Sequence, residues 1–363
     1  MIAAPLDLTD PVSLTEQLVA LPSVSGDEQL IADTVEQALE SLDGLRIERD
    51  GDALVARTEL GLPTRVLLAG HLDTVPIADN VPGSRADGRL FGCGTTDMKS
   101  GVAVMLVAAA AALASPQGPA HDLTLVCYDQ EEVEEVRNGL RRLAAADPAR
   151  LGADLAILLE PTDGTIEAGC QGTCRAEVTV PGRRAHSARS WLGENAIHAA
   201  GPLLERLRTY EPRSVTLDGC TYREGLSAVR ISGGVAGNVI PDACTVTINF
   251  RFAPDRSEDE AHAHVREVVT PLEAVFVDSA PGALPGLSAP AAADFVRTIG
   301  QEPRAKYGWT DVSRFAALGI PAVNFGPGDP NLAHTREESV DIEKIRVATA
   351  QLTRFLSRES PSR

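Results

Sequence analysis

Acidic residues and histidines recur where predicted strands end, and these residue types bind divalent metals. Buried strands are expected at 65–70, 122–128 and 154–159, and each is followed at once by such residues. Ligands in open α/β sheets bind beyond the carboxyl ends of strands. Imidazole and carboxylate groups together suit Zn²⁺ or a similar first-row divalent ion. The candidate set is His71, Asp73, Asp97, Glu131, Glu132, Glu160 and His334.

The spacing of these residues allows a division of roles. Two metal ions that share one bridging carboxylate need about five protein ligands, and the strand-end segments supply that number. Glu131 and Glu132 are adjacent, so one can bind metal while the other moves protons. Asp73 lies two residues after His71 and is placed to accept the second ring N–H of that histidine.

Less specific interpretations exist for each residue. Asp97 could cap the helix that follows it, and Glu131 and Glu132 could be first-turn acids favoured by a helix dipole. Their position at the same end of successive strands argues against this. The pair His262 and His264 is expected at the surface, as are His121 and His198, and a zinc clip at Cys170–Cys174 lacks a second pair of ligands.

The elements that must position these residues alternate between strand and helix in the first half of the chain. Helices are expected at 14–21, 29–42, 99–113 and 133–145, which together with the three strands indicates an α/β fold with a mostly parallel central sheet. The middle of the chain differs. Strands at 175–180, 228–232 and 243–252 and helices at 194–207 and 257–269 indicate a small α+β domain. A Pro/Gly-rich linker is expected at 278–288, before helices at 291–299, 312–318 and 342–356 and a strand at 321–325.

The length of 363 residues and mass of 38.3 kDa indicate two domains. We expect a discontinuous catalytic domain at 1–171 and 287–363, interrupted by an inserted domain at 172–286. The net charge of −18 argues against nucleic-acid and membrane partners. The longest apolar run, 102–114, is too short to span a bilayer. Six scattered cysteines and an N-terminus without a basic leader predict a cytoplasmic protein with reduced thiols.

Five ordered segments resemble the signatures of a known family, the dinuclear zinc aminoacylases and carboxypeptidases. The segments are His71-Leu-Asp-Thr-Val-Pro76, Gly94-Thr-Thr-Asp-Met-Lys-Ser-Gly101, Asp129-Gln-Glu-Glu132, Leu159-Glu-Pro-Thr162 and Ala333-His334. The resemblance covers essentially the whole chain. It implies a zinc-peptidase-like catalytic domain interrupted by a small dimerisation domain that acts as a lid.

The resemblance also implies a role for each matching residue. His71 and Glu160 would hold one Zn²⁺ and Glu132 and His334 a second. Asp97 would bridge the two ions, and its peptide bond to Met98 would be cis. Co²⁺ would be able to substitute. Glu131 would be the general base and Asp73 the partner of His71. In the inserted domain, His186 would reach across a homodimer to stabilise the oxyanion. Asn238 and Arg251 would contact substrate, with Arg175, Arg189 and Lys306 as further candidate cations.

Segments at 167–173, 184–193, 220–230, 233–241 and 306–315 resemble one branch of that family. The activity this implies is hydrolysis of N-succinyl-LL-2,6-diaminopimelate. The catalytic motifs alone do not separate this substrate from another N-acyl amino acid, such as acetylornithine, or an N-acyl dipeptide. A catalytically inactive binding protein on the same fold is the remaining alternative, and it would be expected to lack a ligand or the base.

Overall fold

A computed structural model describes residues 5–358, and the chain divides into two compact units. Unit 1 comprises Met1–Ala168, Pro285–Arg304 and Arg314–Arg363, and unit 2 comprises Gly169–Leu284 and Ala305–Ser313. The sequence places 305–313 in the catalytic domain, whereas in the structure this segment belongs to unit 2. Its backbone carbonyl at Lys306 accepts the Gln171 N–H at 3.2 Å. The prediction of an N-terminus without a basic leader rests partly on residues 1–4, which lie outside the described residues.

The core of unit 1 is an eight-stranded sheet in the order β1-β2-β6-β3-β7-β18-β8-β17. The strands β6, β3, β7 and β18 are parallel to their neighbours in this group, so their carboxyl ends lie at one edge. The predicted α/β fold with a mostly parallel sheet is confirmed. The strands are Arg46–Asp50 (β1), Ala53–Arg57 (β2), Arg65–His71 (β3), Asp122–Tyr128 (β6), Leu155–Leu158 (β7), Glu167–Ala168 (β8), Arg304–Ala305 (β17) and Ala322–Asn324 (β18).

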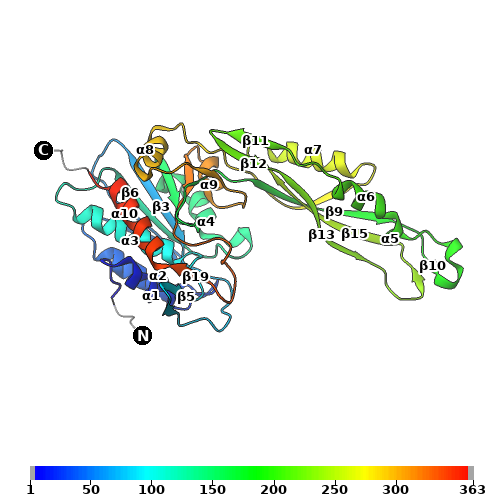
Figure 1. Cartoon of the computed structure of the whole chain (residues 1–363), viewed down its shortest axis with the longest axis horizontal. Helices are drawn as coiled ribbons and strands as arrows, with labels where there is room; N and C mark the ends of the chain where they lie inside the picture. Colours follow the sequence, from blue (N-terminus) through cyan, green and yellow to red (C-terminus); the bar gives the residue numbers. More distant parts are fainter. Residues whose placement is uncertain (1–4, 359–363) are drawn as a thin grey trace. The chain divides into compact units, whose positions relative to one another are not determined.

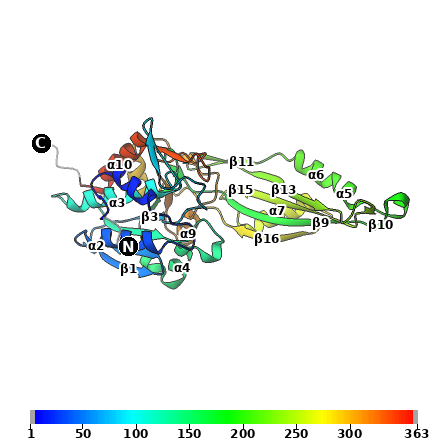
Figure 2. The ribbon, with the colours of Figure 1, turned by 90° about the horizontal axis from the view of Figure 1, so that it is seen from below.

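Helices cover this sheet, and the most deeply buried is α3 (Lys99–Ala114). Small apolar residues lie on all its sides, as expected for a helix enclosed by neighbours, and it packs against α1, α10 and β3 (Figures 1 and 2). A Cβ added at Gly101 would lie 2.0 Å from the Leu159 carbonyl oxygen, so only glycine permits this close approach of α3 to the end of β7. The other helices of unit 1 are α1 (Pro11–Val19), α2 (Gln29–Glu40), α4 (Gly139–Ala146), α8 (Pro290–Ile299) and α10 (Ile342–Leu356), with short 3₁₀ turns η1 (Glu135–Arg137) and η2 (Pro148–Leu151). The helix α9 (Val312–Ala317) begins in unit 2 and ends in unit 1.

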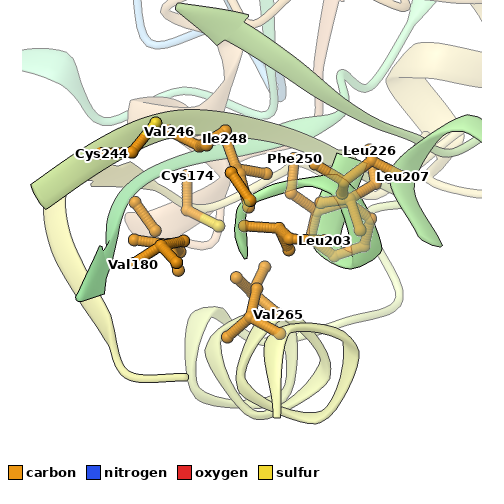
Figure 3. Packing of buried hydrophobic residues seen from close by; sticks show 14 of the residues in the cluster. Cys174, Val180, Leu203, Leu207, Leu226, Cys244, Val246, Ile248, Phe250 and Val265 are labelled. Atoms are coloured by element: carbon orange, nitrogen blue, oxygen red, sulfur yellow. The ribbon is translucent and has the colours of Figure 1, made fainter. Parts of the chain in front are cut away.

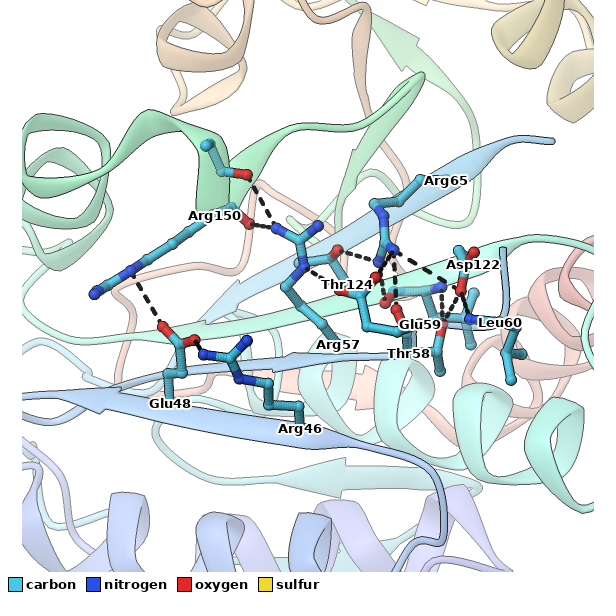
Figure 4. Close-up of polar contacts among 12 residues, drawn as sticks. Arg46, Glu48, Arg57, Thr58, Glu59, Leu60, Arg65, Asp122, Thr124 and Arg150 are labelled. Carbon is cyan, nitrogen blue, oxygen red and sulfur yellow. Dashed lines mark hydrogen bonds and ion pairs between the residues drawn. The ribbon is translucent and has the colours of Figure 1, made fainter. Parts of the chain in front are cut away.

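Two further features of unit 1 bear on the site. A small antiparallel sheet, β19 (Ser339–Asp341), β5 (Arg89–Phe91) and β4 (Ser84–Ala86), flanks the loop that leads to Asp97. At the amino ends of β3 and β6, Asp122 anchors a polar network (Figure 4). Its carboxylate accepts the Leu60 N–H at 2.8 Å. Asp122 therefore ties the loop at Thr58 and Leu60 to the amino end of β6, at the end of the sheet opposite its carboxyl ends.

Unit 2 has a four-stranded antiparallel sheet in the order β13-β15-β9-β16. Residues along β9 alternate between buried and exposed, and the buried ones join a core with α5, α6 and α7 on one face (Figure 3). The elements are β9 (Gly172–Pro181), β10 (Ala185–His186), η3 (Ser187–Leu192), α5 (Ala196–Ala199), α6 (Gly201–Arg208), β11 (Ser214–Leu217), β12 (Cys220–Arg223), β13 (Gly225–Gly233), β14 (Val239–Ile240), β15 (Ala243–Phe252), α7 (Glu258–Val269) and β16 (Ala274–Ala280). In the described part of the chain, no helix combines the length and apolar character needed to cross a membrane.

Four local predictions are wrong. The predicted linker begins inside β16, where Asp278 pairs with Arg175 of β9. The predicted helix at 194–207 is two helices, because Pro202 occupies the first turn of α6. The predicted helix at 133–145 is η1 followed by α4, and the Asn138 side chain caps α4. His121 is also buried rather than exposed, since its ring packs against Phe355.

Candidate metal centre

His71 is the last residue of β3, and its ring is almost completely buried. Its Nε2 lies 3.1 Å from Oδ1 of Asp97. Its Nδ1 lies 3.0 Å from the main-chain oxygen of Asp73 and 3.5 Å from the carboxylate of the same residue. The main-chain oxygen is therefore the nearer acceptor for the ring N–H, which fixes the ring orientation and leaves Nε2 facing Asp97.

Asp97 lies in the loop before α3, and the peptide bond to Met98 is cis. The helix cap is Met98, and no side-chain hydrogen bond caps α3. The interpretation of Asp97 as a helix cap therefore fails. Its two carboxylate oxygens instead face two histidines, since Oδ2 lies 3.4 Å from Nε2 of His334.

Glu131 and Glu132 follow β6 in an irregular segment that precedes η1 and α4. They do not lie in the first turn of a helix, so a helix dipole does not explain them. The buried Asp73 carboxylate accepts both their backbone N–H groups, at 3.0 Å each, and the Ser25 hydroxyl at 2.6 Å. Asp73 thereby holds the Glu131–Glu132 segment against the end of β3.

His334 comes from the loop after β18, and its backbone φ is +62°, a left-handed conformation that is uncommon in residues other than glycine. Its Nε2 lies 2.8 Å from Oε1 of Glu132. Donor atoms gather in three overlapping clusters, each within 4.8 Å: His71, Asp97 and Glu160; His71, Glu131 and Glu132; Asp97, Glu132 and His334. All the residues predicted as ligands, and the predicted base, belong to them.

The electrostatics of this cluster fit a cation. Hydrogen bonds that the His334 ring donates to the carboxylates of Asp97 and Glu132 raise the pKa of His334 to about 10. Burial alone would lower the pKa of His71, but Asp73 and Asp97 raise it well above its ordinary value. Burial alone would raise the pKa of Asp97, and the two histidines outweigh that effect and lower it. Carboxylates that converge in a buried site repel one another unless positive charge lies between them. The donor set therefore fits one or more divalent ions.

The residues predicted to contact substrate all lie in unit 2. His186 and Asn238 are neighbours, since β10 pairs with β14 and the Ser187 N–H donates to the Asn238 main-chain oxygen at 2.9 Å. Nδ1 of His186 accepts the Ala188 N–H at 3.0 Å. Arg189 is exposed in η3, close along the chain to His186.

Arg251 and Lys306 lie near the opposite end of the unit 2 sheet. Arg251 pairs in register with Thr173 near the start of β9, and Lys306 is buried and bonded through its main chain to Gln171. The half-buried Arg251 forms no ion pair within residues 5–358. Burial, and then the nearby Arg175, lower its pKa. This guanidinium is therefore an unneutralised cation on the face of the sheet opposite the apolar core.

Sequence reasoning missed one buried acid beside the centre, Glu338. Its carboxylate accepts backbone N–H groups from the loop that carries Asp97. The residue lies four positions after His334, a spacing without an evident local meaning in the sequence. No periodic pattern or motif would have revealed this contact, because its partners lie more than 240 positions away.

Curated relatives match nearly the full length of the chain, among them two from actinobacterial species. A Mycobacterium tuberculosis protein provisionally named succinyl-diaminopimelate desuccinylase DapE is 59% identical over 355 residues, which cover 97% of this chain and 99% of that protein. A Corynebacterium glutamicum protein named succinyl-diaminopimelate desuccinylase is 50% identical over 358 residues, covering 96% of this chain and 97% of that protein.

Solved structures agree in fold. A tripeptidase from Staphylococcus aureus superposes with a TM-score of 0.75 at 19% identity, covering 97% of this chain and 98% of that one. A Bacillus subtilis protein described as a dinuclear metal binding peptidase superposes with a TM-score of 0.67 at 17% identity, covering 95% and 96%. The model of peptidase family M20/M25/M40 matches residues 67–358. That match extends over most of the chain, which therefore belongs to peptidase family M20/M25/M40.

Proposed function

We propose that this chain hydrolyses N-succinyl-LL-2,6-diaminopimelate to succinate and LL-2,6-diaminopimelate, in lysine and cell-wall diaminopimelate biosynthesis in the cytoplasm. The observation that carries the proposal is the convergence of two histidines and several carboxylates from strand ends far apart in the sequence. The names of relatives that are 59% and 50% identical over nearly the whole chain support the substrate.

The donor set supports a pair of divalent ions, which we propose to be Zn²⁺, with Co²⁺ able to substitute. His71 and Glu160 would hold one ion, Glu132 and His334 the other, and Asp97 would contact both. This sharing agrees with the clusters, because His71, Asp97 and Glu132 each belong to two of them. When bound, such ions polarise the amide carbonyl and acidify the attacking water.

Glu131 is the proposed general base. Its carboxylate would accept a proton from the attacking water and return it to the nitrogen of the leaving amine. The Glu131 backbone N–H is held by Asp73 at 3.0 Å. The base is therefore fixed from behind by a buried carboxylate, while its side chain remains in the cluster with His71 and Glu132.

His186 is the proposed donor to the oxyanion of the tetrahedral intermediate. Because Nδ1 accepts the Ala188 N–H, the proton of the neutral ring lies on Nε2. Nε2–H then projects as a hydrogen-bond donor, which is the tautomer that stabilisation of an oxyanion requires. Asn238, next to it, and Arg189 would contact the polar groups of the same substrate.

Arg251 and Lys306 are the proposed partners of substrate carboxylates. The unpaired, half-buried guanidinium of Arg251 is suited to an anion, because a carboxylate there would neutralise a charge that burial disfavours. The overall charge of −18 repels an anionic substrate at long range. Local cations must therefore supply the attraction.

We propose a homodimer formed through unit 2. Arg251 lies near one end of β15, and β14, the strand that pairs with His186, comes just before the other end, at Ala243. At ~3.3 Å per residue, about 26 Å separates Arg251 from Ala243. One small substrate does not reach both ends within a single chain, so His186 would act on the substrate bound to a second copy. The outer edge of β13 pairs with no strand among the described residues. Val229 and Ile231 on it are 58% and 50% exposed, which suits contact with a second copy.

A substrate panel tests the function. Purified chain supplied with Zn²⁺ would be given N-succinyl-LL-2,6-diaminopimelate, N-acetylornithine and an N-acyl dipeptide, and the released amine would be measured. We expect the succinylated compound to have the highest kcat/KM. Faster hydrolysis of acetylornithine would favour the alternative, a related deacylase. Absence of hydrolysis with any substrate, together with absence of metal binding, would favour a binding protein.

A further inference from the structure

Glu338 lies between His334 and β19, and its side chain is buried. Oε1 accepts the backbone N–H groups of Thr96 at 2.9 Å and Asp97 at 3.0 Å. Oε2 accepts the backbone N–H of Gly94 at 3.0 Å. One carboxylate therefore binds three N–H groups of a loop that has no regular secondary structure to hold it.

Other contacts join the same two segments. The Gly92 N–H donates to the Glu338 main-chain oxygen at 3.0 Å, and the Thr96 hydroxyl donates to the Ser339 main-chain oxygen at 3.0 Å. His334, at the start of the second segment, lies 3.4 Å from Asp97 through its Nε2. The two ends of the segment 334–338 thus both contact Asp97: His334 lies near its carboxylate, and Glu338 accepts its backbone N–H.

Asp73 offers a comparison within the same site. It is also buried, and its carboxylate holds the backbone N–H groups of Glu131 and Glu132. The two acids act on different loops, since Asp73 fixes the loop after β6 and Glu338 fixes the loop before α3. Together they orient the residues that form the cluster of Asp97, Glu132 and His334.

We propose that Glu338 is a positioning residue for the metal centre: its carboxylate holds the Asp97 loop at the separation from His334 that lets both residues bind one ion. The inference rests on the metal centre of the proposed function. Hydrogen-bonding partners of metal ligands usually contribute 10–100-fold to metal affinity. Glu338 acts one step further back, on the backbone of a ligand, and the same range is expected.

Glu338→Gln tests this with little change in shape. A glutamine amide has one acceptor oxygen, and its NH₂ group would face at least one of the backbone N–H donors that the carboxylate accepts. Affinity for Zn²⁺ would be measured by chelator competition and the visible spectrum recorded with Co²⁺. Thermal unfolding of the metal-free protein would follow stability. Asp122→Asn is the matched control, because Asp122 is a buried carboxylate that also accepts backbone N–H groups, from Leu60 and Leu62, at the other end of β6.

We expect the more weakly bound of the two Zn²⁺ ions to bind Glu338→Gln about 10–100-fold less tightly than wild type, and we expect the Co²⁺ spectrum to change. Asp122→Asn is expected to change stability alone. Equal zinc affinity and an unchanged spectrum in Glu338→Gln would overturn the inference, as would equal losses of affinity in both variants. If Glu338→Gln does not fold, Glu338→Asp, which is one methylene shorter, replaces it under the same criteria. A wild-type chain that binds no divalent ion would refute the proposed function itself.

Discussion

At the scale of single residues, some acids of the site belong to the donor clusters, whereas Asp73 and Glu338 accept backbone N–H groups of the loops that carry them. Glu131 and Glu132 are adjacent, and the Asp73 carboxylate accepts the backbone N–H of both. Glu132 lies 2.8 Å from His334, whereas Glu131 clusters with His71 and Glu132 and not with His334. The two neighbours therefore support different roles, and each can be tested by replacing its carboxylate.

Glu131→Gln is expected to lower kcat by about 10²–10⁴-fold, because an amide cannot accept the proton of water. Metal content should remain at the wild-type value, since the five proposed ligands are unchanged. Steady-state rates and metal analysis of the same sample check both expectations. Near-normal turnover with metal retained would refute the assignment of the base.

Arg251→Ala is expected to lower kcat/KM about 10–100-fold, since a charge-assisted hydrogen bond contributes about 1.5–3 kcal/mol. Arg175→Ala is the control, because this neighbouring arginine is already paired with Asp278 at 3.0 Å. Steady-state kinetics of both variants would be compared. A wild-type kcat/KM in Arg251→Ala would remove Arg251 from the substrate site.

The strand-end rule found the clustered residues because it depends on sheet geometry, which a sequence pattern indicates well. His71, Glu131 and Glu160 each follow a strand that the apolar runs predict. Glu338 escaped because its contacts are with backbone N–H groups of a distant loop, and backbone groups carry no sequence signal. The distance between His186 and Arg251 also needed the register of β9 and β15.

At the scale of elements, strands with long apolar runs and helices with clear periodicity could be predicted from the sequence, whereas short or exposed elements could not. The hairpin of β1 and β2 and the edge strand β16 were missed. β16 has exposed valines on its outer surface and is followed by a Pro/Gly-rich stretch, so its sequence resembles a linker. It becomes a strand because β9 offers it a backbone partner.

Glu224 connects three segments of unit 2 and provides a test of stability. Its buried carboxylate accepts Arg213 at 2.9 Å and Arg256 at 2.7 Å. Burial alone would raise the pKa of Glu224, but these hydrogen bonds outweigh it and hold the pKa below its ordinary value of 4.5. Glu224→Gln should therefore cost about 1–3 kcal/mol at pH 7.

The pH dependence of this effect has a definite sign. Because the pKa is lower in the folded state, the stabilisation is present above about pH 4.5 and is lost as the pH falls through the lower, folded value. Urea unfolding of unit 2 would be monitored by hydrogen exchange. The difference in unfolding free energy between wild type and Glu224→Gln should become smaller at acidic pH. A gap that is constant with pH would contradict the account. Glu205→Gln, at an exposed pair with Arg208, is the control and should change little.

At the scale of the whole molecule, the proposed homodimer predicts a variant that keeps metal but loses activity. Ile231→Lys places a charge on the open edge of β13 and should give a monomer, with activity reduced because His186 no longer reaches a second copy. Val275→Lys on β16, the other edge strand, is the control and should remain dimeric. Light scattering and rates check the prediction. A dimeric, active Ile231→Lys, or a monomeric Val275→Lys, would contradict it.

The central claim is that distant histidines and carboxylates form a metal-dependent amide hydrolase. The most direct measurement is a titration of chelator-treated chain with Zn²⁺, following release of succinate from N-succinyl-LL-2,6-diaminopimelate. The account predicts negligible activity at the start, and a rate that rises with bound zinc and levels off at two ions per chain. Full activity without metal, or no release of succinate at any zinc content, would contradict it.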